Sequence, residues 1–535
     1  MRSPEVTFHY DPDPMTIILS TLNARYAHAS LGLRYLMANM DELQPQTRLV
    51  EFVIGARTAD MVEKLLEHAP RIIGFGVYIW NVDETTRLVA MLKRVAPHVR
   101  IILGGPEVSH ESSAQPIVAL ADYLITGWGD ISFAALCRQI LDGPQPLMKV
   151  HVGLQPPLAD IALPYRLYSD TDIAQRTLYV EASRGCPFKC EFCLSALDKT
   201  AWPFDADGFL EELESLHARG ARRFKFVDRT FNLNIKTSLK LMAFFLDKLA
   251  AHPDDPVYAH FEVVPDHLPE PLKAAIARFP AGTLQFEIGI QSFNPTVQAL
   301  VSRRQDNDKA AENIRWLVAH SQAHLHVDLI AGLPGEDIDS FARGFDRLVA
   351  LAPHEIQFGI LKRLRGTPII RHTEAHGLVF DAHPPYTILA TSLISFADMQ
   401  RLVRFARYWD LVANSGRFAH VLPLILDATP FDRFMGLSDW LYARTDATHR
   451  IALERLAALV QQWLTESGHD PRAVTQAMAA DFAAQPGRLQ KQAHVAAKNA
   501  ADRAHAGQLP SPASSKGSSA GQPALPQRQA RHLAL

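Results

Sequence analysis

The sequence predicts an α/β protein made of two successive series of strand–helix units and a helical region that follows them. Short apolar runs alternate with amphipathic segments from residue 15 to 145 and again from 177 to 365. The chain has 535 residues, 47% of them hydrophobic and 21% charged, which is typical of globular proteins. That length allows about two to four domains.

The first series contains five apolar runs, each followed by a polar or amphipathic stretch. The runs are residues 16–22, 49–54, 72–78, 100–103 and 122–125, and the helical patterns between them include 59–68, 83–95 and 133–141. Five consecutive strand–helix units predict a doubly wound parallel sheet of the flavodoxin or Rossmann type over residues 15–145. Ligands of such sheets lie at the carboxyl ends of the strands.

The turns after these strands are rich in glycine and aromatic residues. They include Tyr78-Ile-Trp80-Asn, Gly104-Gly105-Pro and Gly127-Trp-Gly129-Asp. Glycine permits close approach of a ligand to the backbone, and aromatic rings offer flat apolar walls. We therefore expect a large planar ligand with a phosphate-bearing tail at this edge of the sheet.

The second series follows a proline-rich linker, predicted over residues 146–176. Its predicted strands are residues 177–183, 223–227, 258–264, 284–290, 324–330 and 355–361. Polar residues stand at the carboxyl ends of these strands, where the chemistry of α/β barrels gathers. They are Asp228, Arg229, Glu262, Asp266, Glu287, Gln291, Asp328 and Glu336.

Three of the four cysteines lie within eight residues, as Cys186-Pro-Phe-Lys-Cys190-Glu-Phe-Cys193. They supply three thiolates, one fewer than a closed zinc site requires. A [4Fe–4S] cluster held by three thiolates keeps one iron open to another ligand. Cys137 falls in a helical pattern, and we expect a buried small apolar residue there.

The run Ser183-Arg-Gly-Cys-Pro-Phe-Lys-Cys-Glu-Phe-Cys-Leu-Ser195 resembles the cluster loop of radical S-adenosylmethionine (SAM) enzymes. The resemblance implies a [4Fe–4S] cluster on Cys186, Cys190 and Cys193, whose open iron chelates the amino and carboxylate groups of SAM. Reductive cleavage of SAM then gives a 5′-deoxyadenosyl radical. It also implies that Phe192 lies beside the adenine and that the six strand–helix units form a partial (β/α)6 barrel over residues 177–365.

Further residues of the second series match SAM-pocket positions of this superfamily. Glu287-Ile-Gly-Ile-Gln291-Ser resembles a run that lines the pocket, and Ile330-Ala-Gly332-Leu-Pro334 resembles the turn that cradles adenine. Asp228 stands where a Gly-Gly-Glu turn usually binds the SAM amino group, and we expect it to substitute. Glu262 is expected to bind the SAM ribose or ammonium group, or to be a salt-bridged strand residue. Arg184 is expected to contact the cluster loop or the SAM carboxylate.

The first series resembles the cobalamin-binding domain that precedes the barrel in one large radical SAM class. Gly104-Gly105 and Gly127-x-Gly129 match that class, so Tyr78 and these four glycines are expected to contact cobalamin. The D-x-H-x-x-G signature with its cobalt-ligating histidine is absent, because Tyr26 occupies the Asp position. We expect His28 to serve at a helix start. The alternative is a flavodoxin-like domain that recognises substrate or only packs.

The remaining parts of the chain are assigned by composition and by resemblance. Residues 366–480 resemble the uncharacterised C-terminal extension of a subgroup of cobalamin-type radical SAM proteins, and we expect them to be mainly helical and to cap the barrel. Residues 1–14 and 487–535 are expected to be disordered, because their composition offers little apolar surface to bury.

The resemblance implies an enzyme that cleaves SAM and methylates an unactivated carbon of an unknown substrate with cobalamin. Cyclisation or rearrangement is the alternative within the class, and a catalytically silent cobalamin- or redox-responsive binding protein is the alternative outside it. Methylthiolation is disfavoured, since it needs three further cysteines and only Cys137 is available. No catalytic side chain can be assigned.

Partners and compartment follow from the same sequence. A low-potential donor such as flavodoxin or ferredoxin is expected to supply electrons. Few cysteines indicate the reducing cytoplasm. The net charge is −3, so composition gives no argument for nucleic acid or a membrane as partner, and we expect neither.

Overall fold

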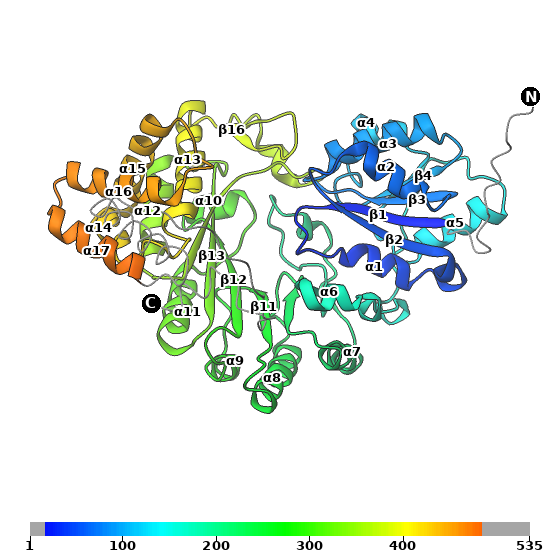
Figure 1. The fold of residues 1–535 in the computed structure, drawn as a ribbon, viewed down its shortest axis with the longest axis horizontal. Helices are drawn as coiled ribbons and strands as arrows, with labels where there is room; N and C mark the ends of the chain where they lie inside the picture. The colour runs from blue at the N-terminus through cyan, green and yellow to red at the C-terminus, as the bar shows by residue number, and fades with distance from the viewer. Residues whose placement is uncertain (1–15, 484–535) are drawn as a thin grey trace, which may run out of the picture. The chain divides into compact units, whose positions relative to one another are not determined.

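The computed structural model, drawn in Figure 1, describes residues 16–483. The chain divides into two compact units. Unit 1 comprises Met1–Ala275, Gln298–Gln305 and Leu361–Ile388, and unit 2 comprises Ile276–Val297, Asp306–Ile360 and Leu389–Leu535. The expectations of disorder for 1–14 and 487–535 lie outside the described residues.

The first sheet has six parallel strands in the order β2-β1-β3-β4-β5-β6, which confirms the doubly wound fold. The strands are β1 (Ile17–Asn23), β2 (Thr47–Val53), β3 (Ile72–Gly76), β4 (Arg100–Gly104), β5 (Tyr123–Thr126) and β6 (Val150–Val152). Five of them lie within two residues of the predicted bounds. The sixth, β6, falls in the predicted linker and escaped notice because three residues carry too short a pattern.

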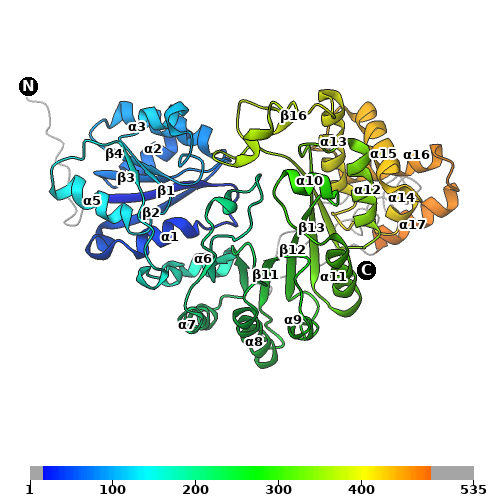
Figure 2. The same ribbon diagram turned by 180° about the vertical axis from the view of Figure 1, so that it is seen from behind.

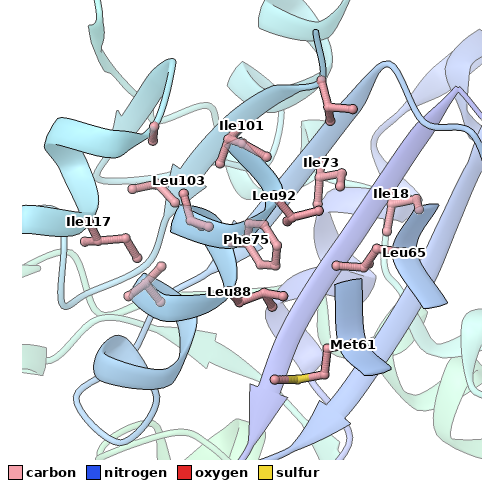
Figure 3. Close-up of a cluster of buried hydrophobic side chains, with 14 of the residues drawn as sticks. Ile18, Met61, Leu65, Ile73, Phe75, Leu88, Leu92, Ile101, Leu103 and Ile117 are labelled. Carbon is pink, nitrogen blue, oxygen red and sulfur yellow. The ribbon is translucent and has the colours of Figure 1, made fainter. Parts of the chain in front are cut away.

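Helices cover both faces of this sheet. They are α1 (Leu31–Ala38), α2 (Thr58–Leu66), α3 (Val82–Val95), α4 (Pro116–Leu120) and α5 (Ser132–Asp142). On one face, Met61 and Leu65 of α2 and Leu88 and Leu92 of α3 pack around Phe75 (Figure 3). On the other face, α1 and α5 form a second core. The central strands are apolar on both sides because both faces are buried.

The second sheet also has six strands, in the order β14-β13-β12-β11-β10-β7. Three strands belong to each unit: β7 (Leu178–Val180), β10 (Arg223–Phe226) and β11 (Tyr258–Val263) to unit 1, and β12 (Leu284–Gln291), β13 (His324–Ala331) and β14 (Glu355–Ile360) to unit 2. Within each unit the neighbouring strands of this sheet are parallel. The helices after these strands are α7 (Ala206–Ala218), α8 (Ile235–Ala251), α9 (Glu270–Ile276), α10 (Pro295–Leu300), α11 (Asn307–His320) and α12 (Ile338–Val349).

Smaller elements complete unit 1. The short helix α6 (Asp170–Gln175) precedes β7, and two-residue strands β8 (Ser183–Arg184) and β9 (Trp202–Pro203) form an antiparallel pair on either side of the cysteine loop. A further small pair is β15 (Val379–Phe380) and β16 (Ile388–Ala390).

The region after residue 390 is helical, as predicted. Its helices are α13 (Phe396–Val412), α14 (Leu422–Leu426), α15 (Pro430–Thr445), α16 (Leu453–Glu466) and α17 (Pro471–Ala483), seen from behind in Figure 2. Phe405 and Trp409 of α13 meet Phe345 of α12 and Phe434 of α15 in ring contacts, so an aromatic core holds these helices together. Among residues 16–483, no helix is long and apolar enough to cross a membrane.

Candidate cofactor site

Unit 1 contains a cavity of about 710 Å³ at the carboxyl ends of the first sheet's strands. Its walls come from the loops after β1, β3, β4 and β5, and from Tyr179, Glu181 and Arg184 at the end of β7 and in β8. The structure brings together around it all the residues predicted to contact cobalamin: Tyr78, Gly104, Gly105, Gly127 and Gly129. Their contact with cobalamin stays a prediction.

Glycines keep this cavity open. A Cβ atom on Gly105, whose φ is +110°, would lie 2.4 Å from the carbonyl oxygen of Val77, so only glycine fits this turn. A Cβ on Gly104 would meet nothing closer than 3.8 Å, so a side chain there would take up cavity space instead. On this observation the cavity fits a large ligand held close to the backbone.

Tyr78 and Trp80 form a flat wall of the cavity. Their rings stack with centroids 4.4 Å apart and planes 6° apart, and the Trp80 indole donates to the carbonyl oxygen of Leu22. Trp80 is nevertheless 47% exposed. A large aromatic surface fixed in orientation and left uncovered suits a planar ligand.

His28 lines the same cavity, and its Nδ1 atom is hydrogen-bonded to the hydroxyl of Tyr179. Burial lowers the pKa of His28, and the positive charges of Arg25 and Lys225 lower it further. The residue just before helix α1, Ser30, caps that helix through a bond from the Leu33 N–H. His28 therefore precedes a helix start, as expected, with one ring nitrogen already engaged.

The cysteine loop follows β8 directly. Cys186 and Cys190 are buried and Cys193 is half-buried, and none forms a disulfide. Burial raises the pKa of the Cys186 and Cys190 thiols. The Cys186 N–H donates to the Asp198 carbonyl (2.8 Å), and Arg303 Nη1 lies 3.6 Å from Cys190 Sγ. Three thiols on one loop with a nearby cation fit an anionic iron–sulfur cluster.

Within residues 16–483, no three His, Cys, Asp or Glu side chains are arranged to hold a single metal ion. A [4Fe–4S] cluster places each thiolate on a different iron atom. The three sulfurs of this loop therefore need not converge on one point to hold a cluster.

Glu191, which sequence reasoning missed, anchors the loop between two of its cysteines. Glu191 is only 3% exposed. Its carboxylate accepts hydrogen bonds from Ser302, Arg371 and His372 Nε2, the last at 2.9 Å. Its backbone carbonyl accepts from the Ile369 N–H. Nothing in the sequence pairs Glu191 with residues 180 positions away.

Asp228 holds the start of the loop. Its carboxylate accepts from the Ala182 N–H (2.9 Å) and from the Ser183 hydroxyl (2.6 Å). Burial raises the pKa of Asp228 to about 7, although these hydrogen bonds oppose the shift. The carboxyl group predicted to bind the SAM amino group thus already has protein donors.

Glu262 is paired with Arg229, whose Nη1 atom lies 2.7 and 3.0 Å from its two oxygens. This agrees with the alternative of a salt-bridged strand residue. Because the Arg229 side chain is 51% exposed and lines the cavity, the pair stands at a surface that a ligand can reach. Phe192 is half-buried between Glu191 and Cys193.

The other predicted SAM residues belong to unit 2. Glu287 and Gln291 lie on β12, and Gln291 ends the strand at φ +69° beside a register irregularity. Its side-chain oxygen is buried and has no hydrogen-bond partner among residues 16–483. Gly332 has φ +87° and Pro334 follows it in the turn after β13. Strain and an unpaired buried oxygen are features of ligand sites.

Comparison with protein families agrees with this geometry. The model of the Radical SAM superfamily matches residues 180–348, and that of the B12 binding domain matches residues 18–137. The chain is therefore a radical SAM protein. More particularly, it is one with an N-terminal B12-binding domain and a C-terminal region of a protein family of unknown function, DUF4080, at residues 374–506.

Curated relatives match part of the chain. A 2-(S-pantetheinyl)-carbapenam-3-carboxylate methyltransferase of Streptantibioticus cattleyicolor is 24% identical over 326 residues, 55% of this chain and 47% of that protein. The cobalamin-dependent radical SAM methyltransferase TokK of Streptomyces tokunonensis is 23% identical over 330 residues, 56% and 47% of the two chains. The chain spans about half the length of the curated relatives it matches.

Solved structures share the fold. The cobalamin-dependent radical enzyme OxsB superposes with a TM-score of 0.60 at 12% identity, covering 88% of this chain and 83% of OxsB. The methyltransferase TsrM from Kitasatospora setae gives 0.53 at 16% identity, covering 68% and 77%. The two family models, rather than these structures, indicate the cofactors of this chain: a [4Fe–4S] cluster, SAM and cobalamin.

Proposed function

We propose that this protein is a radical SAM enzyme that cleaves SAM reductively and, with cobalamin, methylates an unactivated carbon of its substrate. The observation that carries the proposal is the lining of the cavity in unit 1. It runs from the glycine turns of the B12-binding domain to Glu181 and to Arg184, which lies two residues before Cys186. A methyl carrier in this cavity would lie beside the segment that leads into the cysteine loop.

When bound, the cluster and SAM supply a hydrogen-abstracting radical, and cobalamin supplies the methyl group. The protein's residues position these groups and exclude water. Asp228 and Glu191 fix the two parts of the cysteine loop, and the Tyr78–Trp80 wall keeps one side of the cavity apolar. No side chain is needed as nucleophile or general base.

The proposal extends to the electron source and the compartment. Reductive cleavage requires a low-potential electron, for which flavodoxin or ferredoxin is the donor we propose. Free thiols committed to a cluster fit the reducing cytoplasm. The relatives' names support a methyltransferase, and the substrate of this chain is open.

The test is anaerobic reconstitution of the full chain with iron, sulfide and hydroxocobalamin, followed by incubation with SAM and dithionite. We expect about four irons per chain, bound cobalamin, and formation of both 5′-deoxyadenosine and S-adenosylhomocysteine. S-adenosylhomocysteine identifies SAM as a methyl donor, so 5′-deoxyadenosine alone would favour rearrangement or cyclisation. Binding of both cofactors without either product would favour a silent binding protein.

A further inference from the structure

Arg184 lies two residues before Cys186, and it contacts the B12-binding domain. Its Nη1 atom donates to Asp130 Oδ2 (2.9 Å), and Nη2 donates to Glu181 Oε2 (2.9 Å). Its guanidinium group also lies over the Trp128 ring, 4.7 Å from the centroid. The three side chains that form these ion pairs are at most 14% exposed, so solvent screens the pairs little.

Trp128 makes a second link, to the far side of the cysteine loop. Its indole Nε1 donates to Asp198 Oδ2 (3.0 Å). The Asp198 backbone carbonyl in turn accepts from the Cys186 N–H (2.8 Å), and Asp198 Oδ1 accepts from the Thr200 N–H and hydroxyl. Trp128 is thus connected through Asp198 to the backbone of Cys186, a predicted cluster ligand.

The packing leaves these loops little room to move separately. A Cβ atom on Gly153 would lie 1.9 Å from the Trp128 carbonyl oxygen, and one on Gly185 would lie 2.6 Å from Thr200 Oγ1. Gly185 also has φ +91°. Because Trp128 bonds to Asp198 and Asp130 to Arg184, displacing the loop that carries Trp128 displaces groups that hold the cysteine loop.

The loop that makes these contacts also lines the cavity. Gly127, Trp128, Gly129 and Asp130 all contribute to its wall. A ligand that fills the cavity presses on this loop and reduces its freedom. Because the ligand has already ordered the Gly127–Asp130 loop, the cysteine loop loses less conformational entropy when it binds a cluster.

We propose that Trp128, Asp130 and Arg184 are positioning residues that couple the two cofactor sites, so that cobalamin in the cavity strengthens retention of the cluster. The proposal rests on the proposed function, since it requires both cofactors. By linkage, the cluster strengthens cobalamin binding by the same factor. Couplings of this kind are commonly about 5- to 150-fold, and we expect about tenfold here.

The experiment measures iron release from the reconstituted full chain to a ferrous chelator, with and without saturating hydroxocobalamin. In the unaltered protein cobalamin is expected to slow iron release about tenfold. Trp128→Phe keeps an aromatic ring and removes the indole donor, and is expected to bring the ratio of the two rates close to one. Trp440→Phe is the matched control, because Trp440 Nε1 also donates to a carboxylate, that of Glu466, within unit 2.

The ratio of the iron-release rates without and with cobalamin distinguishes coupling between the two sites from a general loss of structure. A residue that only supports the fold would speed iron release equally with and without cobalamin and would leave the ratio unchanged, which would overturn the proposal. A ratio of one in the unaltered protein would do the same. Asp130→Asn, which weakens the pair with Arg184 while keeping its shape, is expected to reduce the ratio independently. A chain that binds neither iron nor cobalamin would overturn the proposed function as well.

Discussion

The hydroxyl of Tyr386 donates a hydrogen bond of 2.7 Å to Oε1 of Glu107, although 279 positions separate the two residues. Arg365 Nε donates to the same oxygen at 2.8 Å. Glu107 is 3% exposed and lies two residues after Gly105 of the cavity wall. The segment after the barrel strands thereby fixes a turn of the B12-binding domain.

Tyr386→Phe is expected to lower the thermal stability of the protein. The Glu107 carboxylate would stay buried with one donor fewer, and hydrogen bonds to charged groups are worth about 1.5–3 kcal/mol. The midpoint of thermal unfolding is the measurement. Tyr26→Phe removes an exposed bond to Gln175 and should change the midpoint little; an equal fall in both variants would contradict the prediction.

Cys186→Ala is expected to abolish the cluster, because two thiolates cannot replace three. Iron analysis after anaerobic reconstitution should fall from about four atoms per chain to near zero. Cys137→Ala is the control, since Cys137 is fully buried in the core between α1 and α5. That variant should keep its iron, and loss of iron in it alone would refute the assignment.

Glu191→Gln is expected to weaken the cysteine loop without removing a ligand. The change keeps an acceptor for Ser302 and loses the ion pair with Arg371. We expect a loss of about 1.5–3 kcal/mol in the free energy of unfolding and faster iron release. Lys189→Ala, at an exposed position of the same loop, should leave both quantities unchanged.

Glu336 makes stability depend on pH. Burial raises the pKa of Glu336 from 4.5 to about 7, and one of its carboxylate oxygens has no hydrogen-bond partner in the part of the chain that the structure describes. The folded state therefore binds this proton more tightly than the unfolded state. The contribution of Glu336 to the free energy of unfolding therefore falls by about 3 kcal/mol as pH rises from 4.5 to 7, and it stays constant above pH 7.

Glu336→Gln removes this dependence while keeping the bond from the Ser292 hydroxyl. Thermal unfolding of both proteins between about pH 5 and 8 is the measurement. The variant should gain stability over the unaltered protein as pH rises. A difference that does not change with pH would show that Glu336 is ionised in the folded state.

Gly104→Val is expected to weaken cobalamin binding at least tenfold with little loss of stability. The added side chain has room at its Cβ, since the nearest atom is 3.8 Å away, and it occupies the cavity. The dissociation constant of hydroxocobalamin, followed by its absorbance, is the measurement. Gly436→Ala, on a helix with its nearest contact at 4.0 Å, should bind cobalamin normally.

Sequence pattern predicted much of the fold because both sheets are parallel and buried. Strands such as β3, with all five residues buried, stand out as continuous apolar runs. The short strand β6 did not stand out, since its Val150 and Val152 side chains are exposed and its pattern covers three residues. The C-terminal region was expected to be mainly helical, but its aromatic core was not foreseen.

The site was predicted where function depends on local sequence and missed where it depends on distant partners. The cysteine spacing and the glycine pairs are local patterns. The first indicated the cysteine loop, and the second indicated the edge of the first sheet where the cavity lies. Glu191, Trp128 and Asp198 act through residues far along the chain, so no spacing rule identifies them. Arg184 was expected to contact the cluster loop or SAM, which stays a prediction; its ion pairs with Asp130 and Glu181 were not foreseen.

Residues 361–388 belong to unit 1, although two segments of unit 2, residues 276–297 and 306–360, precede them in the chain. Arg371 and His372 must meet Glu191, which left the ribosome 180 residues earlier. During synthesis, β12, β13 and β14 are therefore made before Arg371 and His372 can contact the cysteine loop. The contacts that hold Glu191 from residues 369–372 are thus the last part of the loop's support to be made.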